Sequence, residues 1–302
     1  MKKHTNKKFQ KTKSSQKSGS KGGAGSSQQG QKPSRSAKRS AREAGKEPRR
    51  DQGSKLRGAS LYGLHAVREA FLNEERNVET LYCTSAGLSS FEDIMRQAQS
   101  LGLKRPTATM VEKEQLEKTL PPGAVHQGLA LACGALPEKN LEDLLIKYRD
   151  EEQSLLVILD QVTDPHNVGA ILRSACAFGA RGMIMQSKHA PDLGGVLAKT
   201  ACGAVEHVDV AYETNLSRAI EDLQAAGYFV YGLDERGKDI TSVSLPPKAV
   251  VVMGAEGPGM RRLVKEHCDE LLCLPMHGPM RSINVSNAAA VTLHEFANRR
   301  SR

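Results

Sequence analysis

The chain has 302 residues, 39% of them hydrophobic, which is enough for one large domain or two ordinary ones. Aromatic residues make up only 4% and Trp is absent, which argues against single-strand binding mainly by aromatic stacking. The sequence has no run of 18 apolar residues, and its six cysteines include no CxxC pair. It therefore predicts no membrane span and no metal site, with the cysteines as core thiols in a reducing compartment.

Basic charge is concentrated at the start of the chain. Residues 1–60 hold 18 Lys and Arg but only 3 Asp and Glu, whereas the remainder is mildly acidic. Residues 1–57 are rich in Lys, Ser, Gly and Gln and have almost no large apolar side chains, so we expect disorder there. The segment also lacks the apolar region of a secretory signal. Its composition fits either an RNA-binding arm that neutralises phosphates or a solubilising tail.

Folded sequence is predicted to begin near Gly58 with a small α/β domain over residues 58–136. The expected elements are a strand running into a helix (61–73), a strand (78–85), a helix (91–102), a strand–helix step (108–120) and a strand (126–136). The charged segment 137–153, with its short helix, is predicted to be a linker.

The remaining residues, 154–302, alternate apolar strands with helical stretches. The expected strands are 155–160, 182–187, 205–210, 228–234, 249–254 and 270–276. Such alternation predicts a mostly parallel sheet covered by helices on both faces. Ligands of these sheets bind in loops beyond the carboxyl ends of the strands.

The first of these loops to carry polar side chains follows the strand 155–160. Asn167 is placed to cap the next helix, whose apolar stripe is Val168, Ile171, Leu172 and Ala175. Arg173 lies roughly 130° from the centre of that stripe. Taken alone, Arg173 fits an ordinary solvated helix arginine.

The second loop reads Gly-Ala-Glu-Gly-Pro-Gly over residues 254–259. Three glycines and a proline cannot continue the strand, and they let a ligand approach the backbone closely. Glu256 suits a hydroxyl, an amine or an orienting hydrogen bond better than a phosphate. The chain has neither GxGxxG nor GxxxxGK[ST], which disfavours a nucleotide-dependent dehydrogenase.

The third loop follows the strand 270–276 and includes Met276 and Gly278. Its two prolines and glycine predict an irregular backbone whose polar groups lack ladder partners and could read the edge of a heterocycle. Ser282 and Asn284 come next, and Ser286 is the predicted cap of the final helix. Three such loops after three apolar strands suggest one composite pocket.

Together, the runs NVGAILR (167–173), GAEGPG (254–259) and LPMHGPMRSINVSNA (274–288) resemble the three signature motifs of the SpoU (TrmH) family of RNA ribose 2′-O-methyltransferases. The resemblance implies a SPOUT-superfamily α/β sheet with a deep trefoil knot near its carboxyl end. Residues 58–136 resemble the small, ribosomal-protein-like RNA-binding domain of the RlmB-like branch. That branch methylates a guanosine ribose in large-subunit (23S) rRNA.

The resemblance further implies S-adenosylmethionine as the methyl donor and a homodimer in the bacterial cytoplasm. It assigns the donor to Gly254, Leu274 and Ile283 with Met276 and Gly278, and the reaction to Arg173, Asn167, Glu256, Ser282 and Asn284. Because a guanidinium stays protonated, our hypothesis is that Arg173 clamps a phosphate next to the target nucleotide. The proton acceptor is then that phosphate or Glu256. A tRNA substrate, an organellar location and an inactive RNA-binding or ribosome-assembly factor on the same fold remain alternatives.

Overall fold

The computed structural model describes residues 56–300, so nearly all of the predicted tail, residues 1–57, lies outside the described residues. Leu56 and Arg57 are described, and both hydrogen-bond to later residues of the chain. The Leu56 N–H donates to Thr119 Oγ1, and the Arg57 carbonyl accepts a hydrogen bond from the Tyr82 hydroxyl.

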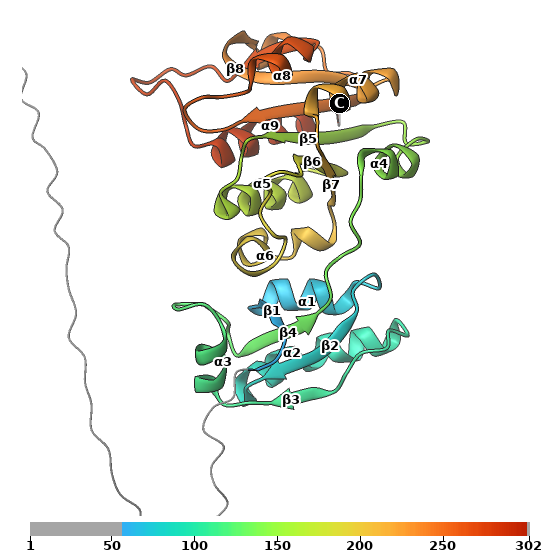
Figure 1. The fold of residues 1–302 in the computed structure, drawn as a ribbon, viewed down its shortest axis with the longest axis vertical. Coiled ribbons are helices and arrows are strands. Elements are labelled where there is room, and N and C mark those ends of the chain that lie inside the picture. Colours follow the sequence, from blue (N-terminus) through green and yellow to red (C-terminus); the bar gives the residue numbers. More distant parts are fainter. Residues whose placement is uncertain (1–55, 301–302) are drawn as a thin grey trace, which may run out of the picture. The chain divides into compact units, whose positions relative to one another are not determined.

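The first sheet has four strands in the order β1-β4-β2-β3 (Figure 1). Only β2 and β3 are parallel neighbours. Helices α1 and α2 pack on one face around Phe71 and Phe91, whereas α3 packs on the other around Leu116. The elements are β1 (Ala59–Tyr62), α1 (Leu64–Leu72), β2 (Val78–Cys83), α2 (Ser85–Ser100), β3 (Ala108–Met110), α3 (Lys113–Thr119) and β4 (Leu129–Cys133).

The second sheet has six strands in the order β10-β8-β9-β5-β6-β7, and every neighbouring pair is parallel. The predicted parallel α/β sheet is therefore confirmed. Its elements are α4 (Leu141–Lys147), β5 (Ser154–Asp160), α5 (Pro165–Ala177), β6 (Gly182–Gln186), α6 (Gly195–Ala201), η1 (Ala204–Glu206), β7 (Asp209–Glu213), α7 (Leu216–Ala225), β8 (Phe229–Asp239), η2 (Ile240–Ser242), β9 (Lys248–Gly254), α8 (Arg262–His267), β10 (Glu270–Cys273) and α9 (Val285–Arg300).

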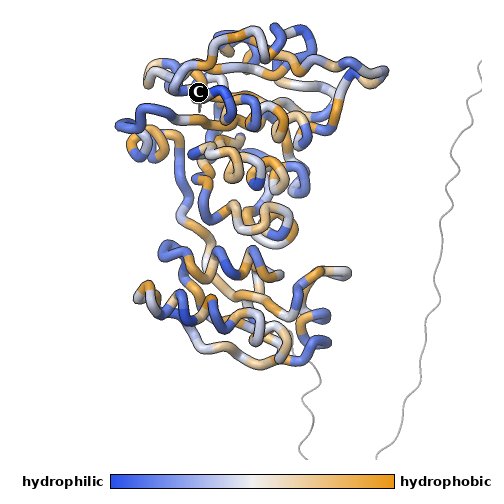
Figure 2. Tube along the Cα trace, turned by 180° about the vertical axis from the view of Figure 1, so that it is seen from behind, coloured by the Kyte–Doolittle hydropathy of each residue, from blue (hydrophilic) through white to orange (hydrophobic). Residues whose placement is uncertain are grey.

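Alternate residues of the central strands face opposite layers of helices. In β5, Leu155 and Val157 pack with α5, α6 and α9, whereas Leu156 and Ile158 pack with α4, α7 and α8. This two-sided burial explains why the strands read as continuous apolar runs. Figure 2 shows that the helices carry both hydrophobic and hydrophilic residues, as helices covering a sheet should.

Several strand predictions need correction. Strand β8 runs to Asp239 rather than to residue 234, and β4 covers only Leu129–Cys133 of the predicted 126–136. Residues 205–210 do not form one strand, because Val205 and Glu206 lie in η1 and β7 begins only at Asp209. The apolar spacing there reflects burial of Val205 and Val208 in the core rather than a pleat. The strand predicted over 270–276 ends at Cys273, two residues before Pro275, which has no N–H to donate to a ladder.

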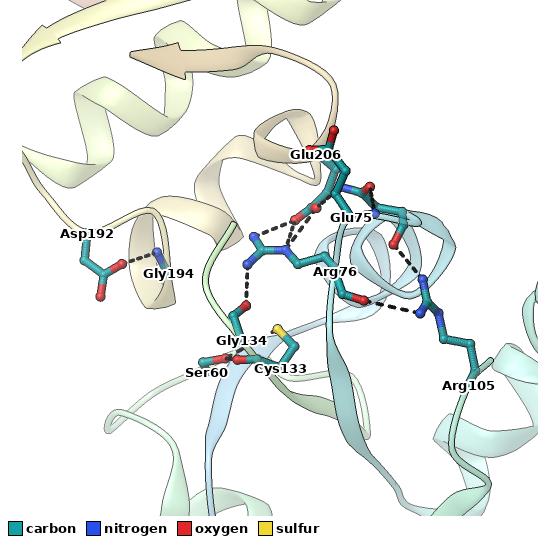
Figure 3. Close-up of polar contacts among 10 residues, drawn as sticks. Ser60, Glu75, Arg76, Arg105, Cys133, Gly134, Asp192, Gly194 and Glu206 are labelled. Atoms are coloured by element: carbon teal, nitrogen blue, oxygen red, sulfur yellow. Dashed lines mark hydrogen bonds and ion pairs between the residues drawn. The ribbon is translucent and has the colours of Figure 1, made fainter. Parts of the chain in front are cut away.

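A buried ion pair connects η1 to the turn that follows α1 (Figure 3). Arg76 and Glu206 have side chains that are 5% and 3% exposed, and Arg76 Nη2 lies 2.8 Å from Glu206 Oε1. Arg76 Nη1 donates to the Gly134 carbonyl at 2.8 Å, and Asn73 Nδ2 donates to Glu206 Oε2 at 2.7 Å. Each charged group therefore has several partners, which a buried charge requires.

The six cysteines all lie in the described part of the chain and are free thiols. Cys83 is buried in the first sheet, and burial raises the pKa of its thiol to about 11. Within residues 56–300, no helix has both the length and the apolar character needed to cross a lipid bilayer.

Candidate active site

The first motif begins α5 at the carboxyl end of β5. The predicted stripe of Val168, Ile171, Leu172 and Ala175 is fully buried, as expected. The predicted cap is wrong, however, because α5 starts two residues earlier than Asn167. Asp164 is the N-cap, and its carboxylate accepts the His166 N–H at 3.1 Å. Pro165 at the first helical position suits that start. The Asn167 amide is thus available for contacts outside its own helix.

The second motif turns sharply after β9. The Gly259 N–H donates to the Ala255 carbonyl at 2.9 Å, and Gly257 and Gly259 have positive φ angles of 82° and 69°. A Cβ on Gly254 would lie 2.3 Å from backbone atoms of Gly259 and Met260. Only glycine fits at position 254 without moving that backbone. The turn leaves Glu256 exposed at its tip.

The third motif contains an irregular stretch, residues 274–283, between β10 and α9. Its backbone N–H and C=O groups have no hydrogen-bond partner among the described residues. The predicted cap at Ser286 is wrong, because α9 begins at Val285 and Asn284 occupies the cap position. Asn284 Oδ1 accepts the Ser286 N–H at 2.8 Å, and the Asn284 carbonyl accepts the Ala288 N–H at 3.0 Å.

One hydrogen-bonded cluster joins the three motifs. Asn167 Nδ2 donates to Glu256 Oε1 at 3.2 Å, and Asn284 Nδ2 donates to Asn167 Oδ1 at 3.1 Å. Asn284 Nδ2 also donates to Glu256 Oε1. The structure therefore brings three of the predicted site residues into contact, although they are up to 117 positions apart in the sequence. Asn284 both starts a helix and holds this cluster together.

Arg173 and Ser282 are not part of this cluster. Both side chains are exposed, and within residues 56–300 neither has a hydrogen-bond or ion-pair partner. Arg173 projects from α5 on the side away from its buried stripe. Helix α5 packs against α9 through the shared core, and the Phe178 and His294 rings meet edge to face at 5.4 Å. A rigid helix thus presents a cation that no other described group neutralises.

The residues predicted to hold S-adenosylmethionine fit that molecule in chemical type. Ile283 and Met276 expose 40% and 38% of their surface, and Leu274 is half-buried against the core. These apolar side chains belong to the stretch 274–283, whose unbonded backbone N–H and C=O groups could pair with the donors and acceptors of an adenine ring. Gly278 has open space around its Cα, and Gly254 allows close approach of the neighbouring turn.

Sequence reasoning did not single out Asp160, the last residue of β5. Asp160 is completely buried, and it accepts hydrogen bonds from the Arg261 backbone N–H and from Arg261 Nε, both at 2.7 Å. The backbone of Asp160 pairs in register with Gly254, and its carboxylate binds Arg261, so residues on both sides of the second motif are held to the end of β5. The available signal was a single acidic residue closing an otherwise apolar strand.

A second carboxylate, Asp234 of β8, has a strongly lowered pKa. Burial raises the pKa of Asp234, but hydrogen bonds from Lys265 and Arg236 outweigh that effect and the net pKa falls to about 2. Lys265 belongs to α8, the helix that follows the second motif. This ion pair fixes α8 against β8.

Comparison with known proteins defines the class of protein that carries this site. Residues 154–294 match the model of the SpoU rRNA Methylase family, and residues 60–138 match a model described as RNA 2'-O ribose methyltransferase substrate binding. The chain belongs to the SpoU rRNA methylase family.

Among individual relatives, the chain is 38% identical over 243 residues to a Haemophilus influenzae protein named 23S rRNA (guanosine-2'-O-)-methyltransferase RlmB. That alignment covers 80% of this chain and 97% of the relative. The Pseudomonas aeruginosa protein of the same name is 37% identical over 245 residues, covering 80% of this chain and 96% of the relative. Among solved structures, the AdoMet complex of the SpoU methyltransferase AviRb from Streptomyces viridochromogenes shares the fold with a TM-score of 0.65 at 23% identity, covering 80% of this chain and 90% of that one.

Proposed function

We propose that this protein transfers a methyl group from S-adenosylmethionine to the ribose 2′-hydroxyl of a guanosine in 23S rRNA. The observation that carries the proposal is the Asn167–Glu256–Asn284 cluster, because it assembles all three motifs at one edge of the sheet. The names of the Haemophilus and Pseudomonas relatives support the choice of rRNA and guanosine. The proposed location is the bacterial cytoplasm, in keeping with the sources of these relatives.

The reaction requires a positioned hydroxyl and an acceptor for its proton. Bound S-adenosylmethionine supplies an electrophilic methyl group on a sulfonium sulfur. Arg173, exposed and unpaired within the described residues, is suited to bind the phosphate beside the target ribose and so orient the 2′-oxygen. A guanidinium cannot accept the proton. Glu256 and the substrate phosphate are the available acceptors. Ser282, two residues before Asn284, is proposed to contribute a hydroxyl to the site.

The proposed active form is a homodimer, with the knot of the SPOUT superfamily in each subunit. Apolar side chains exposed on and just before α9 support the dimer. Met280 is 70% exposed and Val291 is 51% exposed, and a symmetric contact would bury such residues.

We also propose that the substrate-binding domain spans residues 58–136 and the methyltransferase domain residues 154–302, with 137–153 between them. Leu141 and Leu144 of α4, however, pack in the core of the second sheet.

The deciding experiment is methyl transfer from labelled S-adenosylmethionine to 23S rRNA that lacks its own modifications. We expect one 2′-O-methyl mark on one guanosine, mapped by cleavage that is sensitive to this modification. Arg173→Ala and Arg173→Lys should each lower the rate at least ~100-fold while S-adenosylmethionine binding is retained, because only a guanidinium offers two parallel donors to a phosphate. Arg218→Ala is the matched control, since Arg218 is an exposed arginine on α7.

Other outcomes would redirect the proposal in defined ways. Full activity in Arg173→Lys would remove the phosphate-clamp role. Transfer to tRNA but not to rRNA would change the substrate. No binding of S-adenosylmethionine by calorimetry would leave an RNA-binding assembly factor on the same fold as the better description.

A further inference from the structure

The first sheet carries a groove that the methyl-transfer site does not use. The groove has a volume of about 740 Å³ and lies where β2 and β3 end and the loop before β4 begins. Its walls include Met110 and Val125, which are 52% and 65% exposed and are among the most exposed large apolar residues described. Exposure of this kind usually marks a binding surface.

The floor of the groove offers hydrogen-bond donors. His126 is 7% exposed and lines the groove, and its Nδ1 accepts the Gly128 N–H at 3.0 Å. The proton of the neutral ring is therefore on Nε2, which has no partner among the described residues. At the start of α2, Thr84 Oγ1 accepts the Gly87 N–H at 3.2 Å. The Ser85 and Ala86 N–H groups have no acceptor within residues 56–300.

Charge in the groove is nearly balanced. Lys113 and Glu117 form an ion pair of 3.3 Å, and Glu112 is the third charged residue in the lining. Burial lowers the pKa of His126, so the imidazole is neutral near pH 7. A groove with this balance does not attract phosphates. The groove suits an uncharged, flat group. The ring nitrogens or carbonyl oxygens of such a group can accept hydrogen bonds from His126 Nε2 and from the N–H groups at the start of α2.

We propose that this groove holds one unpaired nucleobase of the RNA substrate, with Met110 and Val125 against its face and His126 Nε2 donating to its edge. The inference rests on the proposed function and deepens it, because it gives the substrate-binding region a defined contact. RNA is favoured over a peptide because the matched family model for residues 60–138 is described as substrate binding for RNA methyltransferases.

The test uses the full chain with Met110 and Val125 both changed to alanine. Both side chains are largely exposed, so the double variant should fold, and thermal unfolding would verify this. The matched control is Leu101→Ala, which removes a 59% exposed apolar side chain at the other end of α2. The probe is a single-stranded oligoribonucleotide containing 2-aminopurine, whose fluorescence changes when the base leaves its stack.

We expect the double variant to bind this probe about tenfold more weakly than wild type, with the Leu101 control unchanged and S-adenosylmethionine binding equal in all three proteins. Equal probe binding by the double variant and the control would overturn the inference. Since probe binding does not require methyl transfer, failure of the proposed function would show separately, as absence of transfer by wild type.

Discussion

At the scale of single residues, Glu256 has two candidate functions: it can orient the cluster and it can accept a proton. Its Oε1 accepts hydrogen bonds from the amides of both Asn167 and Asn284, which makes it the junction of the three motifs. It is also an exposed carboxylate, a group that can accept a proton. A substitution that keeps an acceptor oxygen but cannot take up a proton separates these roles.

We expect Glu256→Gln to retain methyl-transfer activity within about tenfold of wild type and Glu256→Ala to lose ~100-fold or more. The reason is that a glutamine oxygen can still accept from both amides, whereas alanine leaves the cluster without its centre. Rates at saturating S-adenosylmethionine and rRNA provide the measurement. If Glu256→Gln falls as far as Glu256→Ala, Glu256 acts as the proton acceptor rather than as an orienting group.

At the scale of elements, the residue at which a helix begins determines which contacts the candidate-site side chains near it can make. Asn167 and Ser286 both have the residue type of a cap, but Asp164 and Asn284 occupy the cap positions. The same shift frees Asn167 to contact Glu256 and gives Asn284 two simultaneous functions. Neighbouring polar residues have similar capping preferences, so composition alone could not choose between them.

The capping assignment gives a stability prediction. Asn284→Ala should lower the free energy of unfolding by about 1 kcal/mol, whereas Ser286→Ala should change it by less than about 0.5 kcal/mol. Only Asn284 accepts the Ser286 N–H at the start of α9. Urea unfolding of the two variants checks this. A larger loss in Ser286→Ala would restore the cap that the sequence predicted.

The elements themselves were largely predictable, because buried parallel strands have a strong apolar pattern. The strands at 154–160, 182–186 and 248–254 lie within one residue of their expected bounds. The pattern failed where tertiary contacts override it. Helix α2 begins at Ser85 rather than at residue 91 because Thr84 caps it, and Glu206 sits in a 3₁₀ turn where it meets Arg76. Asp160 escaped notice because its partner, Arg261, is 101 positions away.

At the scale of the whole molecule, the buried Arg76–Glu206 ion pair joins η1 to the turn after α1. Removing one member of such a pair leaves an uncompensated charge away from water. Exposed pairs such as Arg262 and Glu266 on α8, at 76% and 52% exposure, lack this sensitivity because solvent replaces the lost partner.

We therefore expect Glu206→Gln to reduce the free energy of unfolding by about 3–5 kcal/mol and Glu266→Gln to change it by less than about 0.5 kcal/mol. Urea unfolding followed by circular dichroism measures both. Equal effects in the two variants would mean that Arg76 reaches solvent or finds other acceptors when Glu206 loses its charge.

The unbonded backbone of residues 274–283 has a consequence for turnover. A segment without internal hydrogen bonds loses conformational freedom when a ligand engages it, at a cost of about 1–2 kcal/mol for each residue that becomes fixed. If this segment holds S-adenosylmethionine as proposed, this ordering offsets part of the free energy of the new contacts, and both the donor and its demethylated product bind less tightly than the contacts alone would allow. A donor site that becomes ordered only when its ligand binds would therefore favour release of the product after each round of methyl transfer.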